Sequence, residues 1–269
     1  MINRILCNIE RTDAMAGISA IKDELKLTID ENLPIFINKY REDERSGVQK
    51  LVESAGKRYG RYEQELEHQE YMLTYERKYG DKYDLICGID EAGRGPLAGP
   101  VVAGAVILPK ELKIMYLNDS KQLTEKKREE LYDVIMDQAL AVGVGIVSPE
   151  RIDEINILQA TYEAMRKAVQ SLKIQPQILL NDAVIIPKID LPQVKIIKGD
   201  AKSLSIAAAS VIAKVTRDRM MKEYHQLFPE YGFDQHKGYG SKSHIEAIKK
   251  YGPCPIHRRS FITHFTGGK

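Results

Sequence analysis

The sequence is poor in cysteine, and its three cysteines, Cys7, Cys87 and Cys254, are scattered and form no CxxC pair. Disulfide scaffolds and structural zinc sites need paired or closely spaced cysteines, so this spacing argues against both and is typical of a reducing compartment. The chain also has no uncharged apolar run of membrane-spanning length and no apolar core of signal-peptide length at its N-terminus. We therefore expect a cytoplasmic protein without a membrane partner.

The charge is small in total but unevenly distributed. The formal net charge is +2, yet residues 201–269 carry 12 Lys or Arg against 5 Asp or Glu, so the rest of the chain is net negative. A basic segment on a near-neutral chain favours a polyanionic partner such as nucleic acid. An ordinary solvated surface has the same composition, so charge alone leaves both interpretations open.

The first 80 residues differ from the rest of the chain. They are rich in Glu, Lys, Arg and Tyr, and their apolar residues recur at helical spacing, as at Val48, Leu51 and Val52. We predict a helical N-terminal extension over residues 1–80, broken near Pro34 and around residues 56–60.

Basic and aromatic residues interleave within this extension, at Lys57, Arg58, Tyr59, Arg61 and Tyr62. Such interleaving suits phosphate contact and stacking, so we expect the extension to add to nucleic-acid binding without taking part in chemistry. The glutamates that follow directly oppose this interpretation, because they repel the same polyanion.

The remaining residues, 81–269, alternate between strand and helix patterns. Apolar strand-type runs cover residues 85–90, 101–108, 141–148, 177–182 and 193–200, and helical patterns cover residues 124–140, 149–172, 203–228 and 241–252. The first two strands are neighbours joined by a short loop, and the later ones alternate with helices. The pattern predicts an α/β domain with a mixed β-sheet flanked by helices and a basic, helical C-terminal segment.

Acidic residues lie at or just beyond the ends of three of these strands. They are Asp90 and Glu91, Asp182, and Asp200. Buried carboxylates are costly, and converging carboxylates repel one another, whereas a divalent cation removes both penalties. Mg²⁺ and similar hard cations prefer carboxylate and water oxygens, and a pair of such ions suits phosphodiester hydrolysis. The alternative is that the acids are unrelated turn residues, because Asp favours turns.

The loop between the first two strands is almost free of side chains. Its glycines are spaced Gly93-x-Gly95-x-x-x-Gly99 and a strand follows, so the loop is not a dinucleotide fingerprint, and the chain has no GxxxxGK[ST] motif. Glycines allow backbone amides to approach a ligand closely, and Arg94 would suit an anion. The alternative is a tight strand connection, which Pro96 and Pro100 support in part.

Five segments together carry a resemblance to a known family. They read "GIDEAGRGPLAGPVVAGAVILP", "LNDSKQLTEKKREELY", "IDEINILQATYEAM", "IIKGDAKSLSIAAASVIAKVTRDRMM" and "YGFDQHKGYGSKSHIEAIKKYGPCPIHRRSF". Over residues 84–265 the chain resembles bacterial ribonuclease HII. The resemblance implies a ribonuclease H-like fold and a Mg²⁺- or Mn²⁺-dependent endonuclease. Its substrates would be RNA–DNA hybrids and single ribonucleotides embedded in duplex DNA.

The resemblance also implies roles for individual residues. The catalytic, metal-binding set would be Asp90, Glu91, Asp182 and Asp200, and the implied substrate contacts are Gly93, Arg94, Gly95, Asn118, Ser120, Lys121, Tyr239 and Arg258. The glycine loop would read the 2′-hydroxyl that distinguishes RNA from DNA, and the tyrosine would pack on the next deoxyribose. Taken alone, the residues of "NDSK" are equally a capped turn, Tyr239 a packed aromatic and Arg258 part of a basic tail. We expect the enzyme to act as a monomer.

Two residues depart from the family's usual pattern, and one of them, Ala92 in place of the common valine, is a minor change. Asn181 stands before Asp182 where the family usually carries an apolar residue, so it either perturbs the neighbouring carboxylate or faces away from it. The alternatives are a ribonuclease HIII-like enzyme, a non-catalytic nucleic-acid-binding module, and a transposase- or resolvase-like nuclease. The intact GRG loop argues against the first, the full set of carboxylates against the second, and the sugar-reading loop against the third.

Overall fold

The computed structural model describes residues 16–264, and the chain divides into two compact units between His68 and Gln69. The sequence predicted this boundary near residue 80. The difference is the short helix α5 (Thr74–Gly80), which belongs to the second unit. Among residues 16–264, no helix is both long enough and apolar enough to cross a membrane.

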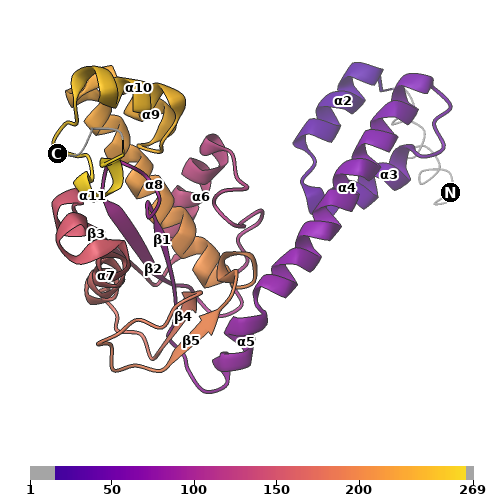
Figure 1. Cartoon of the computed structure of the whole chain (residues 1–269). Helices are drawn as coiled ribbons and strands as arrows, with labels where there is room; N and C mark the ends of the chain where they lie inside the picture. Colours follow the sequence, from indigo (N-terminus) through magenta and orange to yellow (C-terminus); the bar gives the residue numbers. More distant parts are fainter. Residues whose placement is uncertain (1–15, 265–269) are drawn as a thin grey trace, which may run out of the picture. The chain divides into compact units, whose positions relative to one another are not determined.

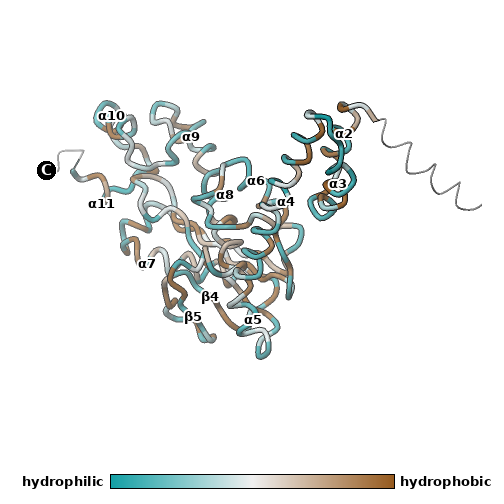
Figure 2. The backbone as a smooth tube through the Cα atoms, turned by 90° about the vertical axis from the view of Figure 1, so that its right-hand side faces the viewer, coloured by the Kyte–Doolittle hydropathy of each residue, from teal (hydrophilic) through white to brown (hydrophobic). Residues whose placement is uncertain are grey.

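The first unit is helical, as predicted. It contains α2 (Ile18–Leu27), η2 (Asp30–Asn32), α3 (Leu33–Tyr40) and most of α4 (Ser46–Met72). Hydrophobic and hydrophilic stretches alternate along these helices (Figure 2), and the apolar side chains form a separate core around Ile21, Phe36 and Val48. The helices are therefore amphipathic elements that stabilise one another within this unit.

One predicted break exists and the other does not. Pro34 lies in the first turn of α3, where its missing N–H costs nothing because that position has no intrahelical acceptor. The break expected at residues 56–60 is wrong, because α4 continues through Gly56 and Gly60. A glycine inside a helix costs only about 1 kcal/mol relative to alanine. Packing of the neighbouring residues against α2 and α3 offsets that cost.

The second unit is built on a five-stranded sheet. Its strands are β1 (Ile86–Ala92), β2 (Val101–Ile107), β3 (Ala141–Val147), β4 (Ile178–Asp182) and β5 (Gln193–Ile196). The strand order is β3-β2-β1-β4-β5. The pairs β1–β2 and β2–β3 are antiparallel, whereas β1–β4 and β4–β5 are parallel. The predicted mixed sheet is confirmed.

Helices cover both faces of this sheet (Figure 1): α7 (Pro149–Gln170) packs on one face, and α8 (Leu204–Leu227) with α6 (Glu125–Gln138) on the other. The other helical segments of this unit are η3 (Gly199–Ala201), η4 (Pro229–Tyr231), α9 (Phe233–His236), α10 (Lys242–Tyr251) and α11 (Arg259–Ile262). Along β2, Ala103 and Ala105 face α7, whereas Val106 lies in the cluster of α6 and α8. This alternation follows from the two-residue period of a strand.

Helix α6 ends earlier than the predicted range of residues 124–140. Thr124 caps the helix by accepting a hydrogen bond from the Lys127 amide, whereas Leu140 lies beyond the helix and is exposed. The C-cap at Ala139 already has extended backbone and leads into β3, which ends the helical period. The helical pattern predicted over residues 149–172 is α7, which is kinked where Asn156 has non-helical backbone angles.

The small residues of α8 allow the helix to lie directly on the sheet. A Cβ on Gly88 would stand 2.1 Å from the carbonyl carbon of Ser205, and one on Gly104 would stand 2.4 Å from the carbonyl oxygen of Ala209. Only glycine permits so close an approach of strand and helix backbones. The contact fixes β1, which carries the first two acids, against the start of α8.

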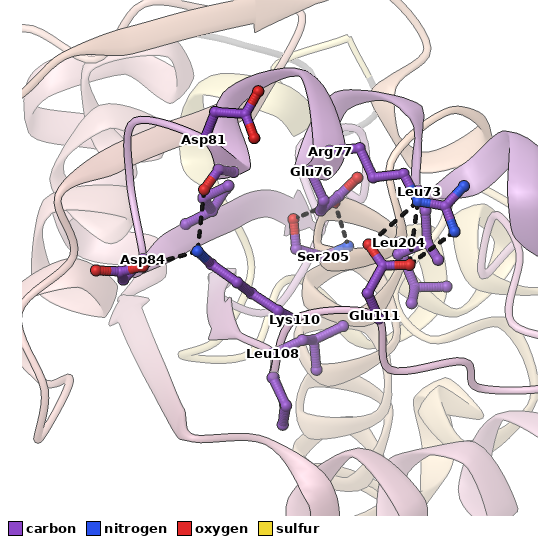
Figure 3. A pocket seen from close by; sticks show the side chains of 13 residues that line it. Leu73, Glu76, Arg77, Asp81, Asp84, Leu108, Lys110, Glu111, Leu204 and Ser205 are labelled. Atoms are coloured by element: carbon purple, nitrogen blue, oxygen red, sulfur yellow. Dashed lines mark hydrogen bonds and ion pairs between the residues drawn. The ribbon is translucent and has the colours of Figure 1, made fainter.

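Helix α5 is attached to the same start of α8. Oε1 of Glu76 accepts hydrogen bonds from the Ser203 hydroxyl at 2.6 Å, the Ser205 amide at 2.9 Å and the Ser205 hydroxyl at 2.7 Å. Figure 3 shows this carboxylate beside a pocket of about 240 Å³, with Arg77, Lys110 and Glu111 around it. Burial raises the pKa of Glu76. Since Ser203 follows η3 closely, α5 supports the turn that carries Asp200.

Candidate active site

Asp90 and Asp182 lie on adjacent strands and leave the sheet on the same face. Ile89 pairs with Asn181 in the parallel β1–β4 ladder, so the two acids occupy the next position on each strand. Asp90 is 4% exposed. Burial, followed by the neighbouring carboxylates of Glu91 and Asp182, raises the pKa of Asp90 well above its usual value. Two acids far apart in sequence therefore act on each other through space.

The remaining two acids, Glu91 and Asp200, also lie within electrostatic range of Asp182. Burial raises the pKa of Glu91, and Asp182 adds to the shift while Arg94 opposes it. Burial also raises the pKa of Asp200, with further contributions from Asp119 and Asp182. All three shifts include Asp182, so the four predicted acids converge at this edge of the sheet.

The strand period explains the neighbouring Asn181. Its side chain leaves the sheet on the face opposite to Asp182 and is fully buried. Its Nδ2 donates to Oε1 of Gln193 at 2.8 Å, and the same oxygen accepts from the Ile186 amide. The asparagine thus ties β4 to the β4–β5 connection and faces away from the acids.

The acids border a cavity of about 280 Å³. It is lined by Asp90, Glu91, Ala92, Gly93, Arg94, Gly95, Ser120, Lys121, Asp182, Ser210, Lys214 and Tyr239. Most of the residues that the sequence proposed therefore share one space. The predicted residues outside this lining are Asn118, Asp200 and Arg258.

The glycine loop follows β1 and forms one wall of the cavity. Gly93 has a φ of +91°, and a Cβ there would stand 2.1 Å from Nε of Arg217, so this position requires glycine for the fold. At Gly95 the nearest atom to an added Cβ is Cε1 of Tyr239 at 3.9 Å. Gly95 therefore leaves open space between the loop and the tyrosine, and the fold does not demand a glycine there.

Two fully buried arginines hold this loop from beneath. Arg217 donates to the carbonyls of Ala98 and Pro100 at 3.0 and 2.9 Å. Arg258 donates to the carbonyls of Gly93, Arg94 and Gly99. Arg258 was expected to contact the substrate directly. Its side chain is instead 0% exposed, and its guanidinium donates to carbonyls of the loop. Nothing in the local sequence pattern indicates this role of Arg217.

The "NDSK" segment is a turn at the edge of the cavity. Asn118 accepts from the Asp119 amide at 2.7 Å, and Asp119 accepts from the Lys121 amide at 2.9 Å. The Lys121 ammonium lies 3.7 Å from Oδ2 of Asp200. Asn118 thus shapes the turn, whereas Lys121 brings positive charge to the acids.

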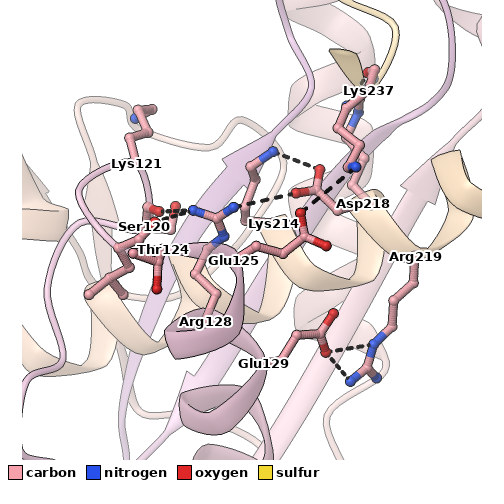
Figure 4. A network of polar contacts seen from close by, with 12 residues as sticks. Ser120, Lys121, Thr124, Glu125, Arg128, Glu129, Lys214, Asp218, Arg219 and Lys237 are labelled. Carbon is pink, nitrogen blue, oxygen red and sulfur yellow. Dashed lines mark hydrogen bonds and ion pairs between the residues drawn. The ribbon is translucent and has the colours of Figure 1, made fainter. Parts of the chain in front are cut away.

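A network of charged side chains supports this turn from α6 and α8 (Figure 4). Arg128 donates to the Ser120 carbonyl at 2.9 Å and lies 3.9 Å from Asp218. Asp218 also accepts from Lys214 at 2.6 Å. Burial lowers the pKa of Lys214, although Asp218 partly restores it. The network holds a second ammonium group at the cavity.

Four further residues of the site were not predicted from the sequence, namely Ser210, Lys214, Arg217 and Asp119. The Ser120 hydroxyl lies 2.8 Å from the Ser210 hydroxyl, and Ser210 also bonds to Asp90. Ser210 and Lys214 sit one helical turn apart on α8, a spacing that signals a shared face. That signal was hidden because the surrounding helix is small and apolar on nearly all sides, so its sequence does not reveal which face meets the cavity.

The acids fit a divalent cation by their chemistry. Three of these carboxylates, Asp90, Glu91 and Asp200, have raised pKa values, and the charge of Asp182 contributes to each shift. Together the four acids form the oxygen-rich donor set that hard ions prefer. Within residues 16–264, no group of three or more His, Cys, Asp or Glu side chains is arranged as a ready-made metal site. Oδ1 of Asp182 accepts a hydrogen bond from the Gly199 amide at 2.7 Å.

The basic residues Lys57 and Arg58 of the first unit are paired with other groups of the same unit. Arg58 donates to the carbonyls of Leu25 and Thr28 and lies 2.5 Å from Asp30. Lys57 pairs with a glutamate one turn earlier. These contacts leave less free positive charge for a polyanion than the sequence suggested.

Comparison with known proteins agrees with the geometry. The family model "Ribonuclease HII" matches residues 87–264, and "Ribonuclease HII N-terminal domain" matches residues 17–80. The chain is 59% identical to ribonuclease HII of Lachnoclostridium phytofermentans over 93% of this chain and 98% of that protein. It is 53% identical to ribonuclease HII of Bacillus subtilis over 91% of this chain and 95% of that protein. Ribonuclease H2 of Pyrococcus horikoshii superposes with a TM-score of 0.57 at 32% identity, covering 68% of this chain and 97% of that one.

Proposed function

The chain belongs to the ribonuclease HII family of endonucleases, which hydrolyse the RNA strand of RNA–DNA hybrids, and on this premise we propose that it also cleaves duplex DNA on the 5′ side of a single embedded ribonucleotide. The products would carry 3′-hydroxyl and 5′-phosphate ends. The corresponding tasks are ribonucleotide excision repair and removal of RNA primers, performed as a cytoplasmic monomer.

One observation carries this proposal. Three of the four convergent acids, Asp90, Glu91 and Asp182, line the same cavity as the glycine loop, with the ring of Tyr239 near Gly95. Hydrolysis of a phosphodiester needs the first feature, and recognition of a 2′-hydroxyl by backbone groups needs the second. Neither a plain DNA nuclease nor a non-catalytic binding module requires both.

The acids would hold Mg²⁺ or Mn²⁺. When bound, such ions activate water and stabilise the leaving oxygen. The protein's own part is to present Asp90, Glu91, Asp182 and Asp200 from three chain segments, and to keep Lys121 and Lys214 near the phosphate. The ammonium groups also reduce the repulsion between a polyanionic substrate and the acids.

The loop and the tyrosine would select the sugar. Gly93, Arg94 and Gly95 line the cavity, and a Cβ added at Gly95 would meet only Cε1 of Tyr239, at 3.9 Å. Tyr239 is 47% exposed, and the Arg217 guanidinium carbon lies 5.9 Å from the centre of its ring. A half-exposed ring held on one side can pack against a nucleotide on the other.

Three substrates of equal length test the proposal. They are an all-DNA duplex, a DNA duplex with one ribonucleotide, and an RNA–DNA hybrid, each labelled at both ends. We expect cleavage of the last two and a single cut 5′ to the ribonucleotide in the second. Cleavage of the hybrid alone would refute the proposed specificity and indicate a ribonuclease HIII-like preference. Equal cleavage of the all-DNA duplex would refute sugar recognition altogether.

A further inference from the structure

Buried histidines form a continuous hydrogen-bonded chain beneath Tyr239. Nδ1 of His244 lies 2.9 Å from the Tyr239 carbonyl, and Nε2 of His244 lies 3.0 Å from Nε2 of His257. Nδ1 of His257 lies 3.0 Å from the Cys254 amide and 3.1 Å from its sulfur. His244 and His257 are 0% and 2% exposed, so these contacts are shielded from water.

The hydrogen bonds of His244 and His257 allow only one consistent arrangement of protons on the two rings. The Cys254 amide is an obligatory donor, so Nδ1 of His257 must accept and its proton must be on Nε2. That proton points at His244, whose Nε2 must then accept, which leaves the His244 proton on Nδ1 and aimed at the Tyr239 carbonyl. The rings are held neutral, since burial lowers the pKa of each to about 4.

The proton position on the ring of a third histidine, His236, is also determined by its hydrogen bonds. The Gly238 amide donates to Nδ1 of His236 at 3.2 Å, so the proton of His236 is on Nε2, 2.7 Å from the Tyr231 carbonyl. The ring of His236 stacks on that of His244, with centroids 4.5 Å apart. The backbone on both sides of Lys237 is thus fixed by neutral imidazoles.

The hydrogen-bonded histidine pair is also connected to the glycine loop. His257 pairs with Ala98 in an isolated β-bridge, and the next residue is Arg258, whose guanidinium holds Gly93 and Arg94. The two walls of the cavity, the loop and the tyrosine, are therefore joined through one histidine pair.

We infer that His244 and His257 are positioning residues that hold Tyr239 at a fixed distance from the glycine loop, through the His244 Nδ1–H bond to the tyrosine's own carbonyl. The inference rests on the proposed role of Tyr239 as the nucleotide-packing ring. It assigns the two histidines no contact with substrate. Their function is to fix the width of the reading site.

The proton arrangement can be tested on the unaltered protein. Long-range ¹H–¹⁵N correlation spectra of the ¹⁵N-labelled chain at neutral pH report which ring nitrogen of each histidine is protonated. We expect His244 protonated on Nδ1, which is the minor tautomer of a free imidazole, and His257 and His236 protonated on Nε2. His225, which pairs with Asp234 on another face of α8, provides a reference resonance. Protonation of His244 on Nε2 would overturn the inference.

Two substitutions at one position separate the bond to Tyr239 from the bond to His257. His244→Asn keeps an N–H donor near Nδ1, whereas His244→Gln keeps a polar group near Nε2. We expect H244Q to lower kcat about tenfold or more, because small misplacements of a positioning group are costly, with duplex binding unchanged. We expect H244N to retain most of the rate, and the control H225Q to match the parent. Equal kinetics of H244Q and the parent would overturn the inference.

A double-mutant cycle tests whether His244 acts through Tyr239. In a Tyr239→Ala background, H244Q should add less than about a threefold further loss, because the ring that it positions is gone. Additive losses would overturn the inference. All kinetics are measured on the hybrid as well as on the embedded ribonucleotide. Absence of cleavage at the ribonucleotide would refute the proposed function, while the hybrid kinetics would still decide the role of His244.

Discussion

Arg258 Nη2 donates a hydrogen bond to the backbone carbonyl of Gly93 at 2.5 Å, across 165 residues of sequence. The same guanidinium reaches the carbonyls of Arg94 and Gly99. The C-terminal segment of the catalytic unit therefore shapes the loop that follows its first strand. Arg258, which was expected to bind a substrate phosphate, therefore supports the site structurally.

Replacing Arg258 by lysine should disturb the loop more than the fold. A lysine keeps the charge but cannot span three carbonyls with a planar fork. We expect R258K to lower kcat at an embedded ribonucleotide at least tenfold, which is about 1.4 kcal/mol of transition-state stabilisation. The slope of binding against salt should not change, because no phosphate contact is lost. Arg259→Lys, at the exposed neighbouring position, is the matched control. A shallower salt slope for R258K would restore the direct phosphate contact.

Alanine substitutions at Gly93 and Gly95 should have different effects. At Gly93 the positive φ and the nearby Arg217 leave no room, so G93A should lower the free energy of unfolding by more than about 2 kcal/mol. At Gly95 the space is open, so G95A should fold normally yet lose discrimination between ribonucleotide and deoxyribonucleotide. Urea unfolding and cleavage kinetics measure the two effects. A destabilised G95A, or a G95A with unaltered selectivity, would contradict the assignment.

Removing the Asp90 carboxylate should abolish cleavage without unfolding the protein. Positioned metal ions supply several kcal/mol of transition-state stabilisation, so D90N should reduce kcat by several orders of magnitude. Its stability should not fall, because the buried charge and its repulsion from Glu91 and Asp182 are removed. Asp137→Asn, at an exposed position of α6, is the control. Near-normal activity of D90N would remove Asp90 from the catalytic set.

Truncation before residue 69 and truncation before residue 81 should have different outcomes. The shorter deletion leaves α5 in place, so the second unit should keep its turnover number. The longer deletion removes Glu76 and its three hydrogen bonds to Ser203 and Ser205. We expect it to lower the free energy of unfolding by about 2 kcal/mol or more. Equal stability of the two truncated chains would show that α5 is dispensable.

The same pair tests nucleic-acid binding by the first unit. We expect the shorter deletion to weaken apparent substrate binding and to give a shallower salt slope, measured by cleavage against substrate concentration at several salt levels. The internal contacts of Arg58 predict that this loss is small. Unaltered binding with reduced turnover would place the first unit in catalysis instead.

Acid should destabilise the protein through the histidine pair. The pKa values of His244 and His257 are lowered from 6.5 to about 4, so the unfolded chain binds more protons between these values. Stability contributed by the neutral rings is complete above about pH 6.5 and is lost as the pH falls toward 4. Burial is the main cause of both lowered pKa values, and at His257 the neighbouring His244 and Arg259 add to it. From pH 7 to pH 5 each histidine should cost about 2 kcal/mol.

Urea unfolding at the two pH values measures this loss. The raised pKa values of Asp90 and Glu91 act in the opposite direction, since protonation of these acids stabilises the folded state as the pH falls. Comparison with H244N isolates the histidine contribution, because asparagine does not titrate. An identical pH dependence of the parent and H244N would show that the pair does not govern acid stability.

Local sequence patterns determined the elements and the chemical character of the site. Period-two and period-3.6 patterns located the five strands and the helices around them, and acids following apolar runs identified Asp90, Glu91 and Asp182. These signals are local, because a strand or helix is specified by residues close in sequence. The same locality explains the errors, since Gly56 and Gly60 resemble a break until packing along α4 outweighs their propensity.

The sequence by itself therefore determined the mixed sheet, the acids and the unusual loop, whereas only the tertiary structure decided how that loop is held. Arg217 and Arg258 are hydrophilic by type and lie in a basic segment, so no local pattern distinguishes them from surface residues. Their burial is set by carbonyls far away in sequence, at Ala98 and Gly93. The histidine pair beneath Tyr239 has the same origin, because a hydrogen bond between two side chains depends on where the whole fold places their backbones.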